Sequence, residues 1–595
     1  MIFGKHINKY YLKYAWMVLL GLAALLVVDY LNLKVPELYR MVINGMNEGV
    51  VELNGEMKTF DLEFLLVHIC RPLLFIIAFI ALGRFAWRYG FFGSAIFVER
   101  DIRDEMFDHA KDLSQQYYHR NKVGNLMSLF TNDLDTINEC FGDGMLMFFD
   151  ALILGSMAFI KMIRMDPLMT LFSMVPMVFL FIAATTVGKL MTDKWEERQE
   201  KFSALSDFSQ ESFTGIAVIK AFAKEVKELH AFRKLSKENE EVNVQYTRIS
   251  TLMDVMITMF VETVIGVILG YGSYLVYKGV FNAGQLIEFI TYFTSIIWPI
   301  LAVSFLIDMG ARGKASLKRV GEFLDAPVDV KDDPSKITDP DPEIRGAIEF
   351  RDLSFSFPDS EIEQLHHVSF KIAAGEHVGL IGRTGCGKTT VVDLIARTYN
   401  VPDGTVFIDG KDVNTMPIQA VRKHIAYVPQ DNFLFSERIS QNIAFSLPDD
   451  KDRKAIMEAA RLADVHDNIM EFEEKYDTVL GENGVTVSGG QKQRISIARA
   501  LLKEADILIL DDSVSAVDTK TEKSILEHLK ETREGKTLIL IAHRITTIEH
   551  MDKIIFLEDG KLVDAGTHHE LLERCEAYRE MVEMQRLEDE RKEYA

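Results

Sequence analysis

Six long apolar segments in the first half of this 595-residue chain place the strongest constraint on how it can fold. The fourth segment has 22 residues and the sixth has 19, and neither contains a charged residue. A helix needs about 20 apolar residues to cross the hydrocarbon core of a membrane. Buried helices of a water-soluble domain would show a polar stripe at helical spacing, which these two segments lack. We therefore predict six membrane-spanning helices, over Ala15–Val28, Phe64–Leu82, Met145–Ile160, Pro167–Gly188, Val255–Val276 and Phe289–Ile307.

Basic residues are distributed unequally between the loops. The N-terminal arm holds three lysines, residues 98–143 hold five Lys and Arg, and residues 189–248 hold eleven, whereas the loops on the opposite side hold six. Cytoplasmic loops of membrane proteins carry the excess of Lys and Arg. We therefore expect the N-terminus, both long loops and the C-terminal half to lie in the cytosol.

The N-terminal arm and the two long loops each allow two interpretations. Residues 1–16 place basic residues before an apolar run, as a signal peptide does, but no small-x-small cleavage site follows, so we expect an interfacial helix with Tyr and Trp anchors. The long loops are either solvated connectors or continuations of spans two to five as helices. Their length and helical periodicity favour continuation. The loop tips, Gln115–Gly124 and Phe213–Phe222, would then be free to contact another domain.

Charge and cysteine content exclude other classes of protein. The formal net charge is −22, and a strongly acidic chain is a poor nucleic-acid binder, so we expect no nucleic-acid partner. The four cysteines show neither C-x-x-C pairing nor zinc spacing. This argues against a disulfide scaffold and against a cysteine-based metal site.

The second half of the chain has the pattern of a separate α/β domain. Residues 326–345 are rich in proline and charge and predict a linker between a membrane domain, 1–325, and a second domain, 346–595. Beyond the linker, strand patterns alternate with helical patterns.

A glycine-rich loop in this domain predicts a nucleotide site. The apolar strand Val378–Ile381 leads into Gly382-x4-Gly387-Lys388-Thr389, and a helical pattern follows. In a P-loop, backbone N–H groups surround phosphates, the lysine reaches the β- and γ-phosphates, and the Thr hydroxyl binds Mg²⁺. We expect ATP to contact Gly382, Arg383, Thr384, Gly385, Cys386, Gly387, Lys388, Thr389 and Thr390. We also expect the helix N-terminus to lower the pKa of the Cys386 thiol and make it reactive.

A second strand, Ile507–Leu510, ends in Asp511 and Asp512. Many buried strands end in Asp at a turn, so this pattern alone is a weak signal. Beside a P-loop, however, a carboxylate at a strand end commonly holds Mg²⁺. We therefore predict that Asp511 holds the metal together with Thr389.

With these motifs, the chain resembles a half-transporter of the ATP-binding cassette (ABC) exporter family along essentially its whole length. The resemblance implies six transmembrane helices with long cytosolic extensions, followed by an α/β P-loop NTPase domain of the ABC type in the bacterial cytoplasmic membrane. The residues that carry it are Val487–Arg494 (the signature, with Val487 where Leu is usual), Gln430 (Q-loop), Ser515–Asp518 (D-loop), His543 (switch histidine), Thr478–Gly484 (exporter-specific loop) and Phe357, where the family stacks adenine, commonly on Tyr.

The resemblance also implies the roles of these residues, with ATP and Mg²⁺ as cofactors. Gln430 would contact the metal, and His543 would contact the γ-phosphate. The residues Ser488, Gly489, Gly490 and Gln491 begin a helix whose N-terminus suits a phosphate. The resemblance implies that this phosphate belongs to ATP on a partner's P-loop, and that Asp518 also lies at the nucleotide site.

Asp512 departs from the family pattern. The family usually has Glu at this position, where it polarises the attacking water. Asp is one methylene shorter, so its carboxylate sits about 1 Å or more from the favoured position, which can cost roughly 10²-fold in rate. The alternative is a tolerated conservative change. We expect a slow ATP site, catalysed by Asp512, Gln430 and His543, in a heterodimer whose second half-transporter has Glu here.

The sequence says less about cargo. Glu262 lies within the fifth span, and intramembrane carboxylates usually face a cavity or a partner, so it contacts either cargo or a neighbouring helix. Met- and Phe-rich patches either form an adaptable apolar cavity or face lipid. The leading hypothesis is ATP-driven export of amphiphilic drugs or lipids. The alternatives are a peptide or siderophore carrier and a regulatory ABC protein that senses nucleotide.

Overall fold

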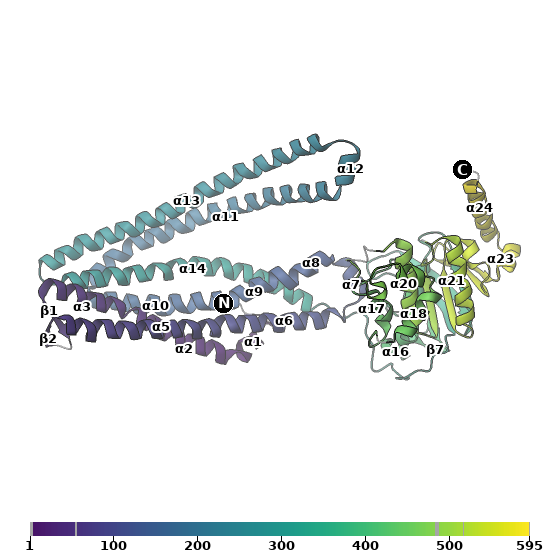
Figure 1. The fold of residues 1–595 in the computed structure, drawn as a ribbon, viewed down its shortest axis with the longest axis horizontal. Helices are drawn as coiled ribbons and strands as arrows, with labels where there is room; N and C mark the ends of the chain where they lie inside the picture. Colours follow the sequence, from purple (N-terminus) through teal and green to yellow (C-terminus); the bar gives the residue numbers. More distant parts are fainter. Residues whose placement is uncertain (1–3, 54–55, 451, 482–486, 516, 594–595) are drawn as a thin grey trace. The chain divides into compact units, whose positions relative to one another are not determined.

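The computed structural model describes residues 4–53, 56–450, 452–481, 487–515 and 517–593, which form two compact units (Figure 1). The first unit comprises Met1–His109 and Gly124–Asp325. The second comprises Ala326–Ala595 together with Ala110–Val123, the tip of the first cytosolic loop.

The first unit is helical apart from one short hairpin. Its helices are α1 (Asn8–Lys13), α2 (Ala15–Asn32), α3 (Val35–Glu48), α4 (Leu62–Phe64), α5 (Arg71–Arg88), α6 (Ser94–Ala110), α8 (Val123–Ser128), α9 (Leu134–Phe141), α10 (Asp143–Met165), α11 (Pro167–Thr214), α12 (Ile216–Ala221), α13 (Glu225–Tyr277) and α14 (Ala283–Leu324). The π-helical turns η1 (Leu65–Cys70), η2 (Tyr89–Gly93) and η3 (Leu129–Asp133) join some of them, and β1 (Val50–Leu53) pairs with β2 (Glu56–Thr59).

The long helices confirm the membrane prediction and the helical continuation of the spans. Among the described residues, five helical stretches are long and apolar enough to cross a membrane, and α11 begins with a shorter apolar stretch, Pro167–Phe179, which is consistent with six spans. The 53 residues of α13 extend about 80 Å, far more than a hydrocarbon core of about 30 Å. Figure 1 shows α11 and α13 side by side, joined at their tip by α12.

The N-terminal arm forms a helix, and two of its predicted anchors, Tyr10 and Tyr14, pack against α6. The hydroxyl of Tyr10 donates to Glu105 at 2.9 Å, and the hydroxyl of Tyr14 donates to Asp101 at 2.7 Å. Both tyrosines are buried, and Lys9 also pairs with Glu105. Charged partners on α6 therefore hold these two rings inside the unit, whereas Trp16 is 59% exposed.

The second unit contains two sheets. A six-stranded, mostly parallel sheet has the order β12-β11-β5-β10-β9-β8, and a four-stranded antiparallel sheet has the order β4-β3-β6-β7. The strands are β3 (Ile348–Ser356), β4 (Glu363–Ile372), β5 (His377–Ile381), β6 (Val406–Ile408), β7 (Lys411–Asp412), β8 (Ile425–Val428), β9 (Ile507–Asp511), β10 (Thr537–Ile541), β11 (Lys553–Glu558) and β12 (Lys561–Gly566).

Helices of the second unit surround these sheets. They are α7 (Gln115–Arg120), α15 (Lys388–Ile395), α16 (Ile418–Lys423), α17 (Ile439–Ile443), α18 (Arg453–Leu462), α19 (His466–Met470), α20 (Gly489–Leu502), α21 (Thr519–Thr532), α22 (Ile545–Ile548), α23 (His568–Arg574) and α24 (Glu576–Glu593), with 3₁₀ turns η4 (Val413–Thr415), η5 (Ala444–Ser446) and η6 (Lys475–Asp477). Strands β5, β9 and β10 read as apolar runs because parallel strands of a sheet covered on both faces are buried on both sides. The α/β architecture predicted for this half is thereby confirmed.

Candidate ATP site

The glycine-rich loop lies between β5 and α15, as the sequence predicted. Gly385 and Gly387 have φ angles of 86° and 96°, a region that favours glycine. A Cβ on Gly382 would lie 2.1 Å from the carbonyl oxygen of Leu557, and one on Gly387 would lie 2.6 Å from Leu365. Nothing lies within 4 Å of a Cβ built on Gly385. The loop therefore packs closely against the protein at Gly382 and Gly387 and leaves free space at Gly385, as a phosphate-binding loop requires.

Lys388 is held inside this loop. Its side chain is only 6% exposed, and Nζ donates to the carbonyl oxygens of Gly382 and Arg383 at 2.9 and 3.1 Å. A buried ammonium is costly unless it is hydrogen-bonded, so the loop backbone fixes the position of this positive charge. On the opposite edge, Gln364 of β4 donates to the carbonyl of Gly385 at 2.9 Å.

The lowered pKa expected for the Cys386 thiol is wrong. The side chain is 3% exposed, and burial raises the pKa of its thiol, although Lys388 opposes the rise. Desolvation of the thiolate outweighs the lowering contributions of Lys388 and of the loop backbone, so we expect this cysteine to react slowly. Among the other loop residues, Thr390 is also buried, whereas Arg383 and Thr384 are exposed.

Two residues predicted to hold Mg²⁺ meet at the base of the loop. The hydroxyl of Thr389 hydrogen-bonds the Asp511 carboxyl, and the Tyr427 hydroxyl donates to Asp511 Oδ2 at 3.4 Å. Burial raises the pKa of Asp511, and these two hydrogen bonds oppose the rise. Burial, with a smaller contribution from Asp511, raises the pKa of Asp393 to about 6. Oxygen ligands beside a P-loop suit Mg²⁺, so the donors present fit this ion.

The order of the parallel strands brings the remaining predicted residues to the same sheet edge. Leu380 of β5 pairs with Ile541 of β10, Ile541 pairs with Asp511 of β9, and Leu510 pairs with Val428 of β8. The segments that leave the carboxyl ends of these neighbouring strands carry the P-loop, His543, Asp512 and Gln430. Ligands of open α/β sheets bind at the carboxyl ends of the strands. Gln430 and His543 are both exposed at this edge.

Asp512 has a left-handed backbone with φ 48°. Its N–H donates to the carbonyl of Ile541 at 3.0 Å, and its own carbonyl accepts the Ser515 hydroxyl at 2.8 Å. Asp tolerates this region of φ better than most residues. The backbone is thus held on both sides, and the length of the side chain sets how far the carboxylate reaches.

Phe357 follows β3 and belongs to an aromatic cluster. Its ring meets Phe355 and Tyr399 edge-on, with centroids 5.3 and 5.2 Å apart. These contacts fix the ring beside the antiparallel sheet.

The signature residues lie on a different part of the unit. Ser488 caps α20 and forms a reciprocal capping box with Gln491, at 3.3 and 3.0 Å, ahead of Gly489 and Gly490. Buried residues of α20 belong to one hydrophobic cluster, whereas buried residues of α15 belong to another. Asp518 caps α21 by accepting from the N–H groups of Lys520 and Thr521, and these bonds lower its pKa. Residues 482–484 of the exporter-specific loop and Ala516 of the D-loop lie outside the described residues.

The tip of the first cytosolic loop contacts this unit through Asp359, two residues after Phe357. Gln116 of α7 donates to Asp359 Oδ1 at 2.7 Å, and Arg120 forms an ion pair with the same oxygen. Gln116 is 7% exposed. The sequence predicted that this tip would be free to contact another domain, but it did not indicate that Asp359 would accept the hydrogen bond and ion pair from the tip. Tyr427, Asp393 and Gln364 were likewise missed, because their only signal is a polar residue in a strand or helix.

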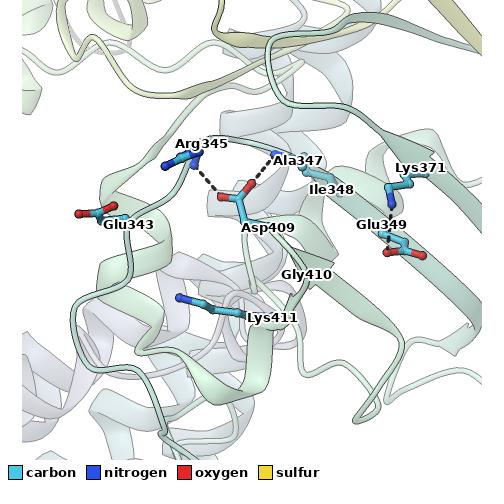
Figure 2. Close-up of a pocket in the computed structure, with 9 residues that line it drawn as sticks. All are labelled: Glu343, Arg345, Ala347, Ile348, Glu349, Lys371, Asp409, Gly410 and Lys411. Carbon is cyan, nitrogen blue, oxygen red and sulfur yellow. Dashed lines mark hydrogen bonds and ion pairs between the residues drawn. The ribbon is translucent and has the colours of Figure 1, made fainter.

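One cavity of the second unit lies away from the predicted ATP site. It has a volume of about 520 Å³ and is lined by residues from Glu343–Glu349, Lys371 and Asp409–Lys411 (Figure 2). Asp409 points toward the linker end and accepts from the N–H groups of Arg345 and Ala347 at 2.6 and 2.9 Å. None of the predicted site residues lines it. Asp409 therefore ties the chain entering β3 to the turn after β6.

Comparisons with known proteins agree with this arrangement. The family description "ABC transporter transmembrane region" matches residues 16–300, and "ABC transporter" matches residues 365–515. The chain is 33% identical to the "Probable multidrug resistance ABC transporter ATP-binding/permease protein YheI" of Bacillus subtilis, over 98% of this chain and 97% of that protein. It is 34% identical to the "Multidrug resistance-like ATP-binding protein MdlA" of Escherichia coli, over 98% and 96%.

One solved structure shows the same fold. It is described as a bacterial Atm1-family ABC exporter with ATP bound, and it matches with a TM-score of 0.72 at 24% identity. The match covers 97% of this chain and 98% of that chain.

Proposed function

Because the chain belongs to the ABC transporter family, and is therefore an ATP-hydrolysing transporter of the bacterial cytoplasmic membrane, we propose that it exports amphiphilic small molecules, either drugs or lipids. The names of the relatives, which refer to multidrug resistance, support this cargo class. The nucleotide-binding domain lies in the cytosol. We assign the membrane domain to residues 1–325, the linker to 326–345 and the nucleotide-binding domain to 346–595.

The ATPase part of the proposal rests mainly on the hydrogen bond between Thr389 and Asp511. This bond lies beneath a loop in which positions 382, 385 and 387 favour glycine, through close contacts or a positive φ. In this proposal the loop backbone and Lys388 bind the phosphates of ATP, and Phe357 stacks on adenine. Thr389, Asp511 and Gln430 would hold Mg²⁺, which when bound neutralises charge on the phosphates. Asp512 would orient the attacking water, and His543 would donate a hydrogen bond to the γ-phosphate.

A second half-transporter is needed to complete each ATP site. The P-loop helix α15 and the signature helix α20 are anchored in different hydrophobic clusters of the unit, so we propose that Ser488–Gln491 faces ATP on the partner. The tip around α12 supports a partner too, because it exposes four large apolar side chains: Phe213 (76%), Ile216 (47%), Val218 (61%) and Phe222 (70%). Such a cluster of exposed apolar residues is typical of a docking surface.

The partner in this proposal differs from this chain. A homodimer would place Asp512 in both hydrolytic sites, which would leave two slow sites. We therefore propose a heterodimer in which the partner has Glu at the matching position and hydrolyses ATP quickly. The site formed by Lys388 and Asp512 then holds ATP and turns it over slowly.

The cargo assignment extends to the membrane unit. Glu262 lies on α13 with its side chain exposed, two residues from the buried Val264. We propose that it faces the translocation path and affects which charges on the cargo are accepted.

Dye uptake tests the proposed function. Inside-out membrane vesicles from cells that produce the chain together with its partner should accumulate a fluorescent amphiphilic dye when ATP is added. The same vesicles without ATP serve as the inactive control. Uptake of peptides or siderophores but not of dyes would favour those carriers. A regulatory ABC protein, which the unusual Asp512 would suit, should bind ATP and transport none of these compounds.

A further inference from the structure

Two acidic side chains of the membrane unit contact each other, and the ATP cycle gives them no role. Asp29 lies in α2 and Asp150 lies in α10, and their side chains share a hydrogen bond. The indole of Trp298, in α14, also donates to Asp150. Helix α10 packs on both α2 and α14, so three helices meet at this cluster.

The hydrogen bonding of Asp29 is incomplete. Its side chain is 2% exposed, yet Oδ2 has no hydrogen-bond partner. Buried polar atoms of native proteins nearly always have a partner, and an unsatisfied one is costly. Within the part of the chain that the structure describes, no Lys, Arg or His forms an ion pair with either carboxyl group. The pair therefore lacks a positive charge.

Asp29 and Asp150 lie within the apolar helices α2 and α10. Asp150 stands eleven residues before Lys161 on α10, which corresponds to about 16 Å along the helix. Lys161 itself is paired with Glu37 at 2.5 Å, near the other end of α10. Carboxylates at membrane depth are costly and usually mark a functional site.

Trp298 of this cluster belongs to an exposed aromatic face of α14. Trp298 is 45% exposed and Phe305 is 54% exposed, and their ring centroids lie 6.4 Å apart. They are separated by two helical turns and so share one face of the helix. Aromatic faces attract cations, most strongly that of Trp. A carboxyl pair without a counterion thus lies beside rings that bind positive charge and apolar groups.

We propose that Asp29, Asp150 and Trp298 form a binding site for the positively charged group of a lipophilic cation. This inference rests on the proposed export of amphiphilic compounds and narrows their class. The cation would supply the charge that the two carboxyl groups lack, and its apolar groups would lie against Trp298 and Phe305. A pair that only holds helices together would instead have no preference for charge.

Equilibrium dialysis with two probes of similar size tests the site. Tetraphenylphosphonium carries a permanent positive charge, and triphenylphosphine oxide is neutral. The purified transporter, with its partner, should bind tetraphenylphosphonium, and Asp29→Asn and Asp150→Asn should each weaken this binding about tenfold or more. Binding of the neutral probe should change less than twofold. Asp308→Asn, which removes a 70% exposed carboxylate from α14, is the matched control and should change neither.

Three results would overturn the proposal: no binding of tetraphenylphosphonium to the wild type, unchanged binding in both Asn variants, or equal loss for both probes. Asp150→Glu keeps the charge and should retain affinity, so it guards against misfolding of the Asn variants. Failure of the wild type to export either probe would refute the proposed function, whereas the dialysis result would still decide the existence of the site.

Discussion

Lengthening one side chain, in Asp512→Glu, tests whether the ATP site of this chain is slow for a geometric reason. The backbone at this position is fixed by the bond from its N–H to the carbonyl of Ile541 and by the bond from the Ser515 hydroxyl. The substitution therefore changes mainly the reach of the carboxylate, by one C–C bond of about 1.5 Å.

The expected gain follows from the cost of misplacement. A carboxylate about 1 Å from its favoured position can cost roughly 10²-fold in rate, which corresponds to about 2.7 kcal/mol of barrier. Glu is less suited than Asp to a φ of 48°, and this backbone conformation costs it about 1–2 kcal/mol. Glu504 adopts a φ of 52° in the same unit, so the conformation is accessible. This strain lowers folding stability and leaves the gain in rate intact.

The assay must isolate this site from the partner's. Ser488→Arg blocks the γ-phosphate position that this chain supplies to the partner's site, so the remaining ATPase activity comes from the Asp512 site. In that background, Asp512→Glu should raise turnover by up to about 10²-fold. Asp512→Asn should lower it further and serves as the control. The reasoning is refuted if the Glu variant with Ser488→Arg hydrolyses ATP no faster than Ser488→Arg alone.

Three further substitutions and one labelling experiment have defined outcomes. Lys388→Ala should weaken MgATP binding about 30-fold or more, measured by equilibrium binding, because losing a buried hydrogen-bonded charge costs about 2 kcal/mol or more. Maleimide should not label Cys386 in the folded protein, as mass spectrometry would show, because the thiol is buried and its pKa is raised. Asp359→Ala leaves the buried Gln116 amide without its acceptor, which weakens this contact by about 1–3 kcal/mol. Dye transport should therefore fall about fivefold or more while ATP binding is retained. Glu262→Gln should reduce export of cationic dyes more than export of neutral dyes.

Controls for these variants come from the same chain. Retained MgATP affinity in Lys388→Ala would contradict the P-loop assignment, and rapid labelling of Cys386 would contradict its burial. Arg120→Lys keeps the positive charge opposite Asp359 and should preserve transport. An equal loss of cationic and neutral export in Glu262→Gln would assign that residue to helix packing.

The sequence predicted those features that depend on neighbouring residues in the chain. Apolar runs of 19 to 22 residues without charge predict membrane spans, because a helix of about 20 residues crosses the hydrocarbon core and an unpaired charge there would be costly. The strand before Gly382 and the strand before Asp511 each carry their polar residues at the carboxyl end. Parallel pairing through β10 then brings them to one sheet edge. Local pattern and a general rule of α/β sheets were sufficient for this much.

Only the tertiary structure decided which side chains from distant segments meet. Asp29 follows an apolar run and reads in the sequence as the flank of a span, yet packing of α2 on α10 places it against Asp150. Cys386 reads as reactive from its place at a helix N-terminus, yet the surrounding core buries it. Sequence periodicity indicates which residues share a helix face, but the neighbour of that face depends on how all the helices pack together. Burial and counterion pairing are properties of that packing, and for this reason they were visible only in the folded chain.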